Sequence, residues 1–359
     1  MMIKPNALLL AILFSSSTYA NDFEIINTFD SEIYTEAQPV KSFLDEFDKP
    51  LSSGDSAFTF NVFELGVKYK GVAVGAQSRY NYALEFDPDT ALFTYLEKND
   101  LPFEARNYRY YLKGKQSTSH GIFLSYDFNF FDETLTIVPK VTYYQSAHFQ
   151  DAIVDGTVFS DEIKGALETQ YFFSKDILFK SFTPKQSPEG EGYSIDLAIK
   201  WRVNDDLTLS FKGLDLINET KYSGVGFVNG VTTDVPFTEQ GDSIETSPSV
   251  RLRTSAFGRE VDYSFEHDAR YYFDVQYRLN DRVSFDVFTR RFYKDTFIQG
   301  NINYHFNDSW RAFSGYETNS KAVEFGIAND YFGLSVKTDR LDLDDAHYAN
   351  INWFIRLVL

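Results

Sequence analysis

Apolar and polar side chains alternate residue by residue through most of the sequence, and this period of two constrains the fold more than any other feature. In residues 193–204 one face carries Tyr193, Ile195, Leu197, Ile199, Trp201 and Val203, while the other carries Ser194, Asp196, Ala198, Lys200, Arg202 and Asn204. Residues 72–86 and 271–280 repeat the pattern. Successive side chains of a β-strand point to opposite faces, so each segment reads as a strand with one apolar and one polar face. Helical periodicity is almost absent, and the sequence therefore predicts an all-β protein.

Two kinds of connection separate these strands. Short Asn- and Asp-led turns occur at 204–206, 280–282 and 307–309, where these residues tolerate turn dihedrals and bond to their own backbone. Longer, acidic connections containing Gly and Ser occur at 87–104, 146–161 and 217–247. Tight turns at one end and long loops at the other predict an antiparallel up-and-down sheet with unequal ends.

The first 20 residues have the features of a secretory signal peptide. Lys4 precedes the apolar run 7–14, and small residues lead to a predicted cleavage after Ala20. No later stretch approaches the roughly 18 consecutive apolar residues of a membrane helix. Residues 21–56 are strongly acidic and are expected to form a periplasmic segment or a small plug, with a short helix within 40–51. We expect the remaining residues, 57–359, to form the strand domain.

Alternating strands occur both in soluble sandwiches and in membrane barrels, and three features favour the barrel. Many segments exceed the usual 5 to 6 residues of a globular strand and reach the roughly 9 to 11 that cross a bilayer. Aromatic residues gather at strand ends, as at Trp201, Trp310 and Trp353, where interfacial girdles lie. The chain also carries an export signal. The segments number about 16 to 18, with 14 possible if the weaker ones belong to loops.

The signal, the alternating strands, the unequal ends and an amphipathic final strand resemble those of Gram-negative outer-membrane β-barrel proteins. The resemblance covers nearly the whole chain after residue 20. It implies short periplasmic turns, long acidic extracellular loops, contact with outer-membrane lipid and lipopolysaccharide, and recognition of the last strand by the barrel-assembly machinery. The family's last strand usually ends in Phe or Trp, whereas this one ends in Leu359, with Trp353 further in.

If apolar faces meet lipid, the polar faces line the lumen, because a charge on the lipid face costs about 2 to 4 kcal/mol at the bilayer midplane. Basic and acidic residues are nearly balanced on those faces. The predicted pore-lining residues are Arg79, Glu85, Asp196, Lys200, Arg202, Arg270, Asp274, Arg278, Asp286, Arg290, Arg311, Glu317, Glu324 and Arg356.

Opposed rows of charge are typical of porin constrictions, so we expect a channel through which small polar solutes diffuse. The lumen aromatics Tyr272 and Phe354 suit saccharides. One alternative is a salt-bridged lumen that only supports the wall. Another is a barrel that anchors an interaction or assembly surface in the envelope. A homo-oligomer is possible in each case.

Catalysis, cofactors and nucleic acid are not expected. The formal net charge of -18 disfavours nucleic-acid binding, and the absence of Cys excludes thiolate chemistry and disulfides. The five His show no local metal motif, and no phosphate loop or serine-hydrolase motif occurs, so no metal site and no catalytic residue is predicted. If the barrel were an enzyme, substitution of His267 or His120 by Ala would be expected to abolish its activity.

Overall fold

The computed structural model describes residues 23–159, 164–177, 182–233, 258–292, 294–307 and 309–359. The signal peptide predicted at 1–20 lies outside them. The helices are α1 (Val40–Leu44) and α2 (Pro88–Lys98). The strands are β1 (Phe23–Thr35), β2 (Ser56–Tyr69), β3 (Val72–Phe86), β4 (Asn107–Tyr126), β5 (Phe128–Phe130), β6 (Leu135–Phe159), β7 (Lys164–Phe173), β8 (Gly190–Arg202), β9 (Leu207–Thr233), β10 (Arg259–Phe265), β11 (Arg270–Arg278), β12 (Val283–Phe292), β13 (Asp295–His305), β14 (Arg311–Glu317), β15 (Val323–Ala328), β16 (Phe332–Thr338) and β17 (Tyr348–Val358).

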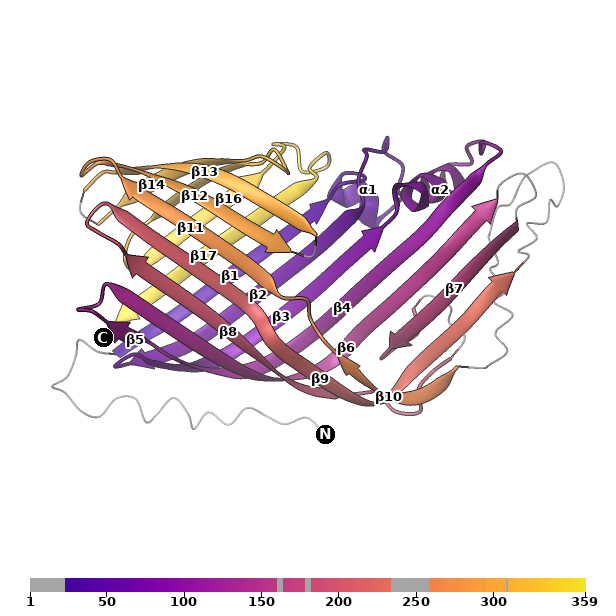
Figure 1. The fold of residues 1–359 in the computed structure, drawn as a ribbon, viewed down its shortest axis with the longest axis horizontal. Helices are drawn as coiled ribbons and strands as arrows, with labels where there is room; N and C mark the ends of the chain where they lie inside the picture. The colour runs from indigo at the N-terminus through magenta and orange to yellow at the C-terminus, as the bar shows by residue number, and fades with distance from the viewer. Residues whose placement is uncertain (1–22, 160–163, 178–181, 234–257, 293, 308) are drawn as a thin grey trace.

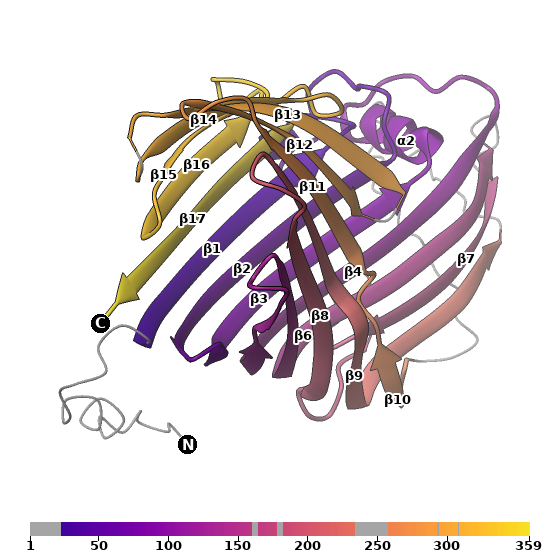
Figure 2. The same ribbon diagram turned by 60° about the vertical axis from the view of Figure 1, so that its left-hand side comes forward.

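These segments form one closed antiparallel barrel with 14 positions around its circumference. Three positions hold two segments end to end: β4 with β5, β7 with β8, and β10 with β11. The ring closes where β1 pairs with β17, with Phe29 opposite Trp353. Figures 1 and 2 show the steeply tilted strands and place the C-terminus beside the start of β1.

The two ends of the barrel differ as the sequence predicts, but two of the predicted long connections are wrong, because β6 continues through 146–159 and β9 continues through 217–233. At the tight-turn end, Asn side chains bond the backbone that follows them: Asn204 Oδ1 accepts from the backbone N–H groups of Asp206 and Leu207, both at 2.9 Å. Asn280, Asn307 and Asn329 repeat this arrangement. The β2–β3 turn instead uses Gly71 at φ +82°, which a glycine adopts without strain. The start of β1 and the end of β17 also lie at this tight-turn end. The long connections lie at the opposite end, called here the loop end.

Two sequence-based boundaries need correction. The higher strand count of 16 to 18 treated segments that lie end to end as separate strands, and the ring has the lower count of 14. Residues 21–56 are also not a separate segment or plug, because β1 pairs with both β2 and β17 and so belongs to the wall. The acidic residues of β1 misled the prediction, since its inward face is acidic while its outward face is apolar or neutral. The expected helix within 40–51 is the short α1 in the β1–β2 loop.

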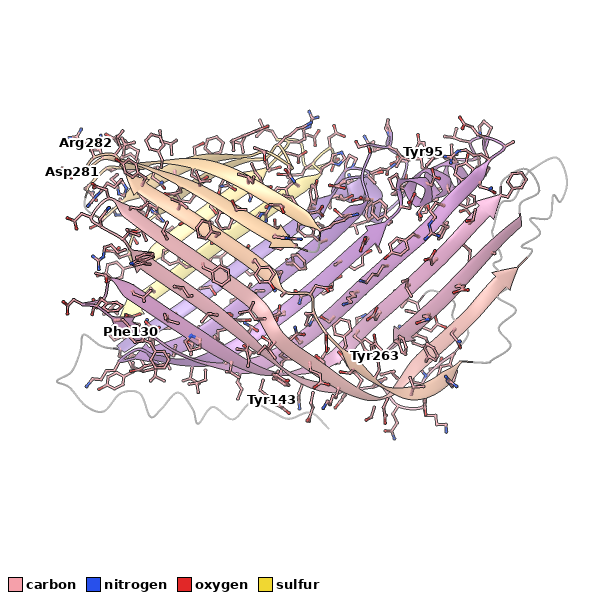
Figure 3. All side chains as sticks on the ribbon, viewed as in Figure 1. Tyr95, Phe130, Tyr143, Tyr263, Asp281 and Arg282 are labelled. Carbon is pink, nitrogen blue, oxygen red and sulfur yellow. The ribbon has the colours of Figure 1, made fainter. Side chains whose placement is uncertain are left out.

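The wall has an apolar exterior. Ile122, Leu124 and Phe325 are among the large apolar side chains exposed on its outer face, where lipid would contact them. Exposed aromatic residues gather toward the tight turns, as expected for an interfacial girdle: Tyr69, Tyr126, Phe128, Phe130, Trp201, Tyr277, Phe306 and Trp310. Figure 3 shows Phe130 at this end, with Asp281 and Arg282. Among the described residues, no helix is long and apolar enough to cross a bilayer.

The loop end is covered in part by α2. Asp87 caps this helix by accepting from the backbone N–H of Asp89 at 2.9 Å, and Pro88 suits its first turn. Phe93 packs on Tyr108 of β4 and on neighbouring apolar residues of the outer wall. The helix thereby covers the outer surface of the long strands where they extend beyond the apolar belt.

Candidate functional site

A layer of aromatic side chains crosses the lumen in the half nearer the loops. The layer, called here the aromatic layer, consists of Tyr34, Phe58, Phe60, Phe292, Phe297 and Tyr348. Phe58 and Phe60 belong to β2, and Phe292 belongs to β12, which faces β2 from the opposite side of the ring. The Phe292 ring lies 5.2 Å from that of Phe58 and 5.3 Å from that of Phe60. Opposite walls therefore touch through their own side chains.

A buried network of charges braces one side of the aromatic layer. It is centred on Arg290 of β12, whose Nη2 donates to both carboxylate oxygens of Glu317 of β14, at 3.0 and 2.9 Å, and whose Nη1 contacts Glu32 of β1. Lys337 of β16 is 3.1 Å from Glu317, and Tyr348 donates to Glu32 at 2.7 Å. The Arg290 guanidinium also lies 4.5 Å from the centre of the Phe297 ring. Charge pairing and ring contact thus hold the same residues in place.

A second buried network braces the other side. Arg79 of β3 lies 2.6 Å from Asp215 of β9 and 3.4 Å from Asp196 of β8. Arg270 of β11 is 3.1 Å from the other oxygen of Asp215, and its guanidinium lies 4.6 Å from the Phe60 ring centre. All four charged side chains are at most 5% exposed. Buried charges that are paired across the lumen tie together strands that are not neighbours in the wall.

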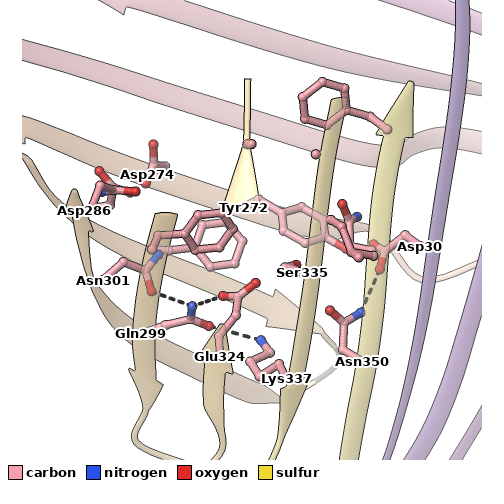
Figure 4. A pocket seen from close by; sticks show the side chains of 18 of the residues that line it. Asp30, Tyr272, Asp274, Asp286, Gln299, Asn301, Glu324, Ser335, Lys337 and Asn350 are labelled. Carbon is pink, nitrogen blue, oxygen red and sulfur yellow. Dashed lines mark hydrogen bonds between the residues drawn. The ribbon is translucent and has the colours of Figure 1, made fainter. Parts of the chain in front are cut away.

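Toward the tight turns the lumen opens into a polar cavity, called here the vestibule (Figure 4). One part has a volume of about 310 Å³ and reaches from Glu32 and Arg290 down to Arg311 and Phe354. An adjoining part of about 390 Å³ shares Tyr272 with it and extends to other strands. The vestibule is lined by amides, carboxylates and aromatic rings: Asn301, Asn303, Asn350, Asn352, Asp30, Asp274, Asp286, Glu324, Tyr272, Phe288, Phe313 and Phe354.

Hydrogen bonds hold several vestibule side chains in fixed positions. Gln299 contacts Glu324 and donates to Asn301 at 2.6 Å, and Asn350 donates to Asp30 at 2.8 Å. Figure 4 shows Asp274 and Asp286 close together on one side, and Asp30 with Asn350 on the other. The vestibule therefore presents ordered acceptors and donors around open space, an arrangement suited to contact polar solutes.

The strand register places all fourteen predicted pore-lining residues on the inner face of the wall. Five of them lie buried in the two networks, namely Arg79, Asp196, Arg270, Arg290 and Glu317. Asp274, Asp286, Arg311, Glu324 and Lys200 line the vestibule. Glu85 lies at the loop end, while Arg202, Arg278 and Arg356 lie toward the tight turns. A role of these residues in conduction stays a prediction.

The sequence patterns miss several residues that close the lumen. Asp215 falls on the outward parity of β9, but a bulge at φ +55° turns it inward to meet Arg79 and Arg270. Glu32 was missed because β1 was not recognised as a wall strand. Phe58 and Phe292 fall on the inward faces of their strands, and no local signal tells that their rings face the same point across the lumen. A break in strict alternation at 214–216 is the one signal that indicates the bulge.

The two His candidates for catalysis are not brought together. His120 is exposed on the outer face of β4, whereas His267 lies between β10 and β11 with its Nε2 3.4 Å from Ser117 Oγ. Ser117 is only 2% exposed, and Asn218 fixes the His267 backbone through two hydrogen bonds. Asp215, the nearby carboxylate, is engaged by two arginines.

The loop end is acidic, and two of its carboxyl groups have altered proton affinities. Burial is the main cause that raises the pKa of Glu36, which follows β1. Hydrogen bonds from Arg106, at 2.9 and 2.8 Å, lower the pKa of Asp89 in α2. Loops in this region are also joined by surface ion pairs such as Lys41 with Asp344 at 2.8 Å.

Comparison with known proteins finds distant similarity in structure only. No family model and no curated protein matches the sequence. The toluene transporter TbuX of Ralstonia pickettii is 9% identical, with a TM-score of 0.42, 94% of this chain and 88% of that chain covered. The toluene transporter TodX of Pseudomonas putida is 12% identical with a TM-score of 0.39 (95% and 89% covered). A FadL homologue of Pseudomonas aeruginosa is 10% identical with a TM-score of 0.39 (94% and 89% covered). These distant likenesses carry no functional argument.

The closed ring, the apolar exterior and the polar interior are those of a membrane-spanning β-barrel. Its lumen contains an open vestibule and, nearer the loops, a half crossed by the aromatic layer.

Proposed function

We propose that the protein is an outer-membrane channel for small polar solutes, with a passage that the aromatic layer keeps closed until it is displaced. The observation that carries the proposal is the way the lumen is divided. A polar vestibule leads to a layer of side chains, and within the described part of the chain no separate domain enters the lumen. Displacing a few rings would join the vestibule to the loop end.

The lining of the vestibule supports the solute class. Four Asn side chains offer both donors and acceptors, and Tyr272, Phe288, Phe313 and Phe354 offer ring faces. Amides beside aromatic rings can contact the hydroxyl groups and the apolar faces of a saccharide. Carboxylates outnumber cations among the residues that line the part of about 310 Å³, which favours neutral or cationic solutes over anions.

A second candidate function is the passage of small apolar molecules. The aromatic layer favours it, because rings in contact across the lumen exclude water and ions but offer an apolar solute a matching surface. The two candidates differ in what the layer does: for a polar solute it is a barrier, and for an apolar solute it is part of the path.

Planar-bilayer recording tests the proposal. Wild-type protein is expected to show rare or small conductance steps, and the Phe58→Ala/Phe292→Ala double variant should show frequent, larger ones. A double variant that is folded, as judged by circular dichroism and heat-modifiable gel migration, but does not conduct would contradict the proposal.

Uptake into proteoliposomes distinguishes the two solute classes. With the double variant, entry of a labelled disaccharide should rise relative to wild type if the layer is a barrier to polar solutes. Wild-type protein that admits a small aromatic hydrocarbon but never a disaccharide, even after the double substitution, would favour the second candidate.

A further inference from the structure

Three carboxyl groups from opposite walls meet at the loop end, directly above the aromatic layer. Glu36 follows β1, Asp55 precedes β2, and Asp295 begins β13. We call these three residues the mouth cluster. Glu36 and Asp55 belong to one side of the ring, and Asp295 belongs to the β12–β13 hairpin that leans over from the other side (Figure 1). The cluster therefore sits where the hairpin meets the opposite wall.

The spacing of the mouth cluster fits one metal ion. One oxygen of each carboxylate lies within 4.8 Å of the others. Ca²⁺ binds oxygen at about 2.3–2.6 Å, so two ligands on opposite sides of the ion are about 5 Å apart. A single Ca²⁺ could contact all three groups with little movement of the backbone. Mg²⁺ requires shorter, near-octahedral bonds and is the poorer fit.

Lysines offset only part of the negative charge around the cluster, and two of them, Lys113 and Lys115, line the same cavity as Glu85 and Asp295. Glu85 adds a fourth carboxylate nearby, and Lys294 is the cation that reaches them, 2.6 Å from Asp55 and 4.0 Å from Glu85. All three carboxyl groups of the mouth cluster are partly buried. Excess negative charge in a partly buried position favours a bound cation.

A neutral oxygen next to the cluster supports the same interpretation. Ser56 is only 7% exposed. Its hydroxyl faces Asp295 yet has no hydrogen-bond partner of normal geometry. Ser56 lies opposite Glu85 in the β2–β3 pairing, and the Ser56 carbonyl accepts from the backbone N–H of Glu36. The Ser56 side chain therefore lies on the same inner face as the side chains of Glu85 and Glu36. A buried hydroxyl without a partner costs free energy, which a metal ion would offset by taking the oxygen as a ligand.

We propose that the mouth cluster and the Ser56 hydroxyl bind one Ca²⁺, and that the ion fastens the β12–β13 hairpin to β1 and β2. Tyr34 supports the site by donating to Glu36 at 3.1 Å, and its ring belongs to the aromatic layer. A bound ion thereby stabilises the closed arrangement of the lumen. Binding itself does not depend on the protein being a channel, whereas the effect on conduction rests on the proposed function.

Titration of the full-length folded protein in detergent, after removal of cations with EDTA, tests the site. Calorimetry with CaCl₂ should show one site, and Tb³⁺ should show luminescence on tyrosine excitation because Tyr34 adjoins the ligands. Asp295→Asn is expected to weaken Ca²⁺ binding about tenfold or more, and Ser56→Ala by a smaller factor. Lys294→Ala should tighten binding, since it removes the competing cation.

Asp281→Asn is the matched control. It makes the same charge change in an exposed turn at the other end of the barrel, and Ca²⁺ affinity should stay at the wild-type value. Equal affinities in Asp295→Asn and Asp281→Asn, with both folded, would overturn the proposed site, as would an absence of Ca²⁺ binding by the wild type.

Conduction then separates the two proposals. In the Phe58→Ala/Phe292→Ala background, Ca²⁺ added on the loop side should lengthen the closed times, and Asp295→Asn should abolish this effect. Ca²⁺ binding without any conductance would support the metal site and contradict the proposed channel. Conductance without Ca²⁺ binding would support the channel and contradict the metal site.

Discussion

The two halves of the lumen are built from the same alternating strands, yet one is filled and the other is hollow. In the half nearer the loops, inward positions carry long or aromatic side chains such as Phe58, Arg79 and Arg290, which reach the opposite wall. In the vestibule, the shorter Asn301 and Asn352 stand among larger side chains such as Phe354, and together they leave open space. The two halves thus differ in whether their inward side chains meet across the lumen.

The comparison also shows that the same charged residue type has two different roles. Arg290 is buried between two carboxylates, whereas Arg311 in the vestibule is half-buried and has Asn303 at 3.5 Å. Buried pairs are costly to break, because the remaining charges cannot be solvated, and solvated charges are cheap to lose. Substitutions in the two halves should therefore differ in the size and the kind of their effects.

The largest expected effect is that of Arg290→Ala. It leaves Glu32 and Glu317 buried with less compensation, and should lower the free energy of unfolding by about 3–5 kcal/mol. Arg311→Ala, its vestibule counterpart, should cost less than about 1 kcal/mol. Urea unfolding in lipid vesicles measures both, and equal losses would remove the distinction between the two halves.

Phe292→Ala should have the next largest effect. The ring is fully buried among Phe58, Phe60 and Phe297, so its loss should cost about 3 kcal/mol and raise conductance by opening the aromatic layer. Phe288→Ala, on the same strand but in the vestibule, is expected to cost less than half as much. Conductance that rises equally in both variants would show that the aromatic layer is not the barrier.

Stability should also depend on pH through the closed half. Because the pKa of Glu36 is raised in the folded protein, the folded chain binds this proton more tightly than the unfolded chain. Without divalent cations, the free energy of unfolding should therefore fall as pH rises from about 4 toward 7. Urea midpoints across this range should show a smaller slope in Glu36→Gln. An unchanged slope would mean that Glu36 ionises as it does in water.

The smallest expected effect concerns selectivity in the vestibule. Glu324→Gln in the Phe292→Ala background should shift the reversal potential in a salt gradient toward anions, because one lumen carboxylate is lost. Stability should change by less than about 1 kcal/mol. Glu133→Gln, in an exposed turn outside the lumen, is the control and should leave the reversal potential unchanged.

Local sequence patterns indicate most of the wall but not what fills it. Alternation and the Asn-led turns indicate most strands, the unequal ends and the inward position of residues such as Arg79, because these depend on neighbours along the chain. The strand β1 is an exception, because its acidic inward face resembles a solvated leader. The contact of Phe58 with Phe292 depends on barrel size and strand offset, which no short segment encodes. Asp215 shows a further limit: a local bulge turns its side chain inward, and only an irregular alternation indicates it.

The seam between β1 and β17 has a consequence for how the barrel forms. Its last hydrogen bonds and the ion pair of Glu24 with Arg356 join residues 332 positions apart in the chain. Contacts of such high contact order carry a large loop-closure entropy when they form early, and little once the strands between are already paired. Ring closure is thus expected to be the final and slowest step of folding, and until it occurs the nascent sheet presents two unpaired edges that must be shielded from other chains.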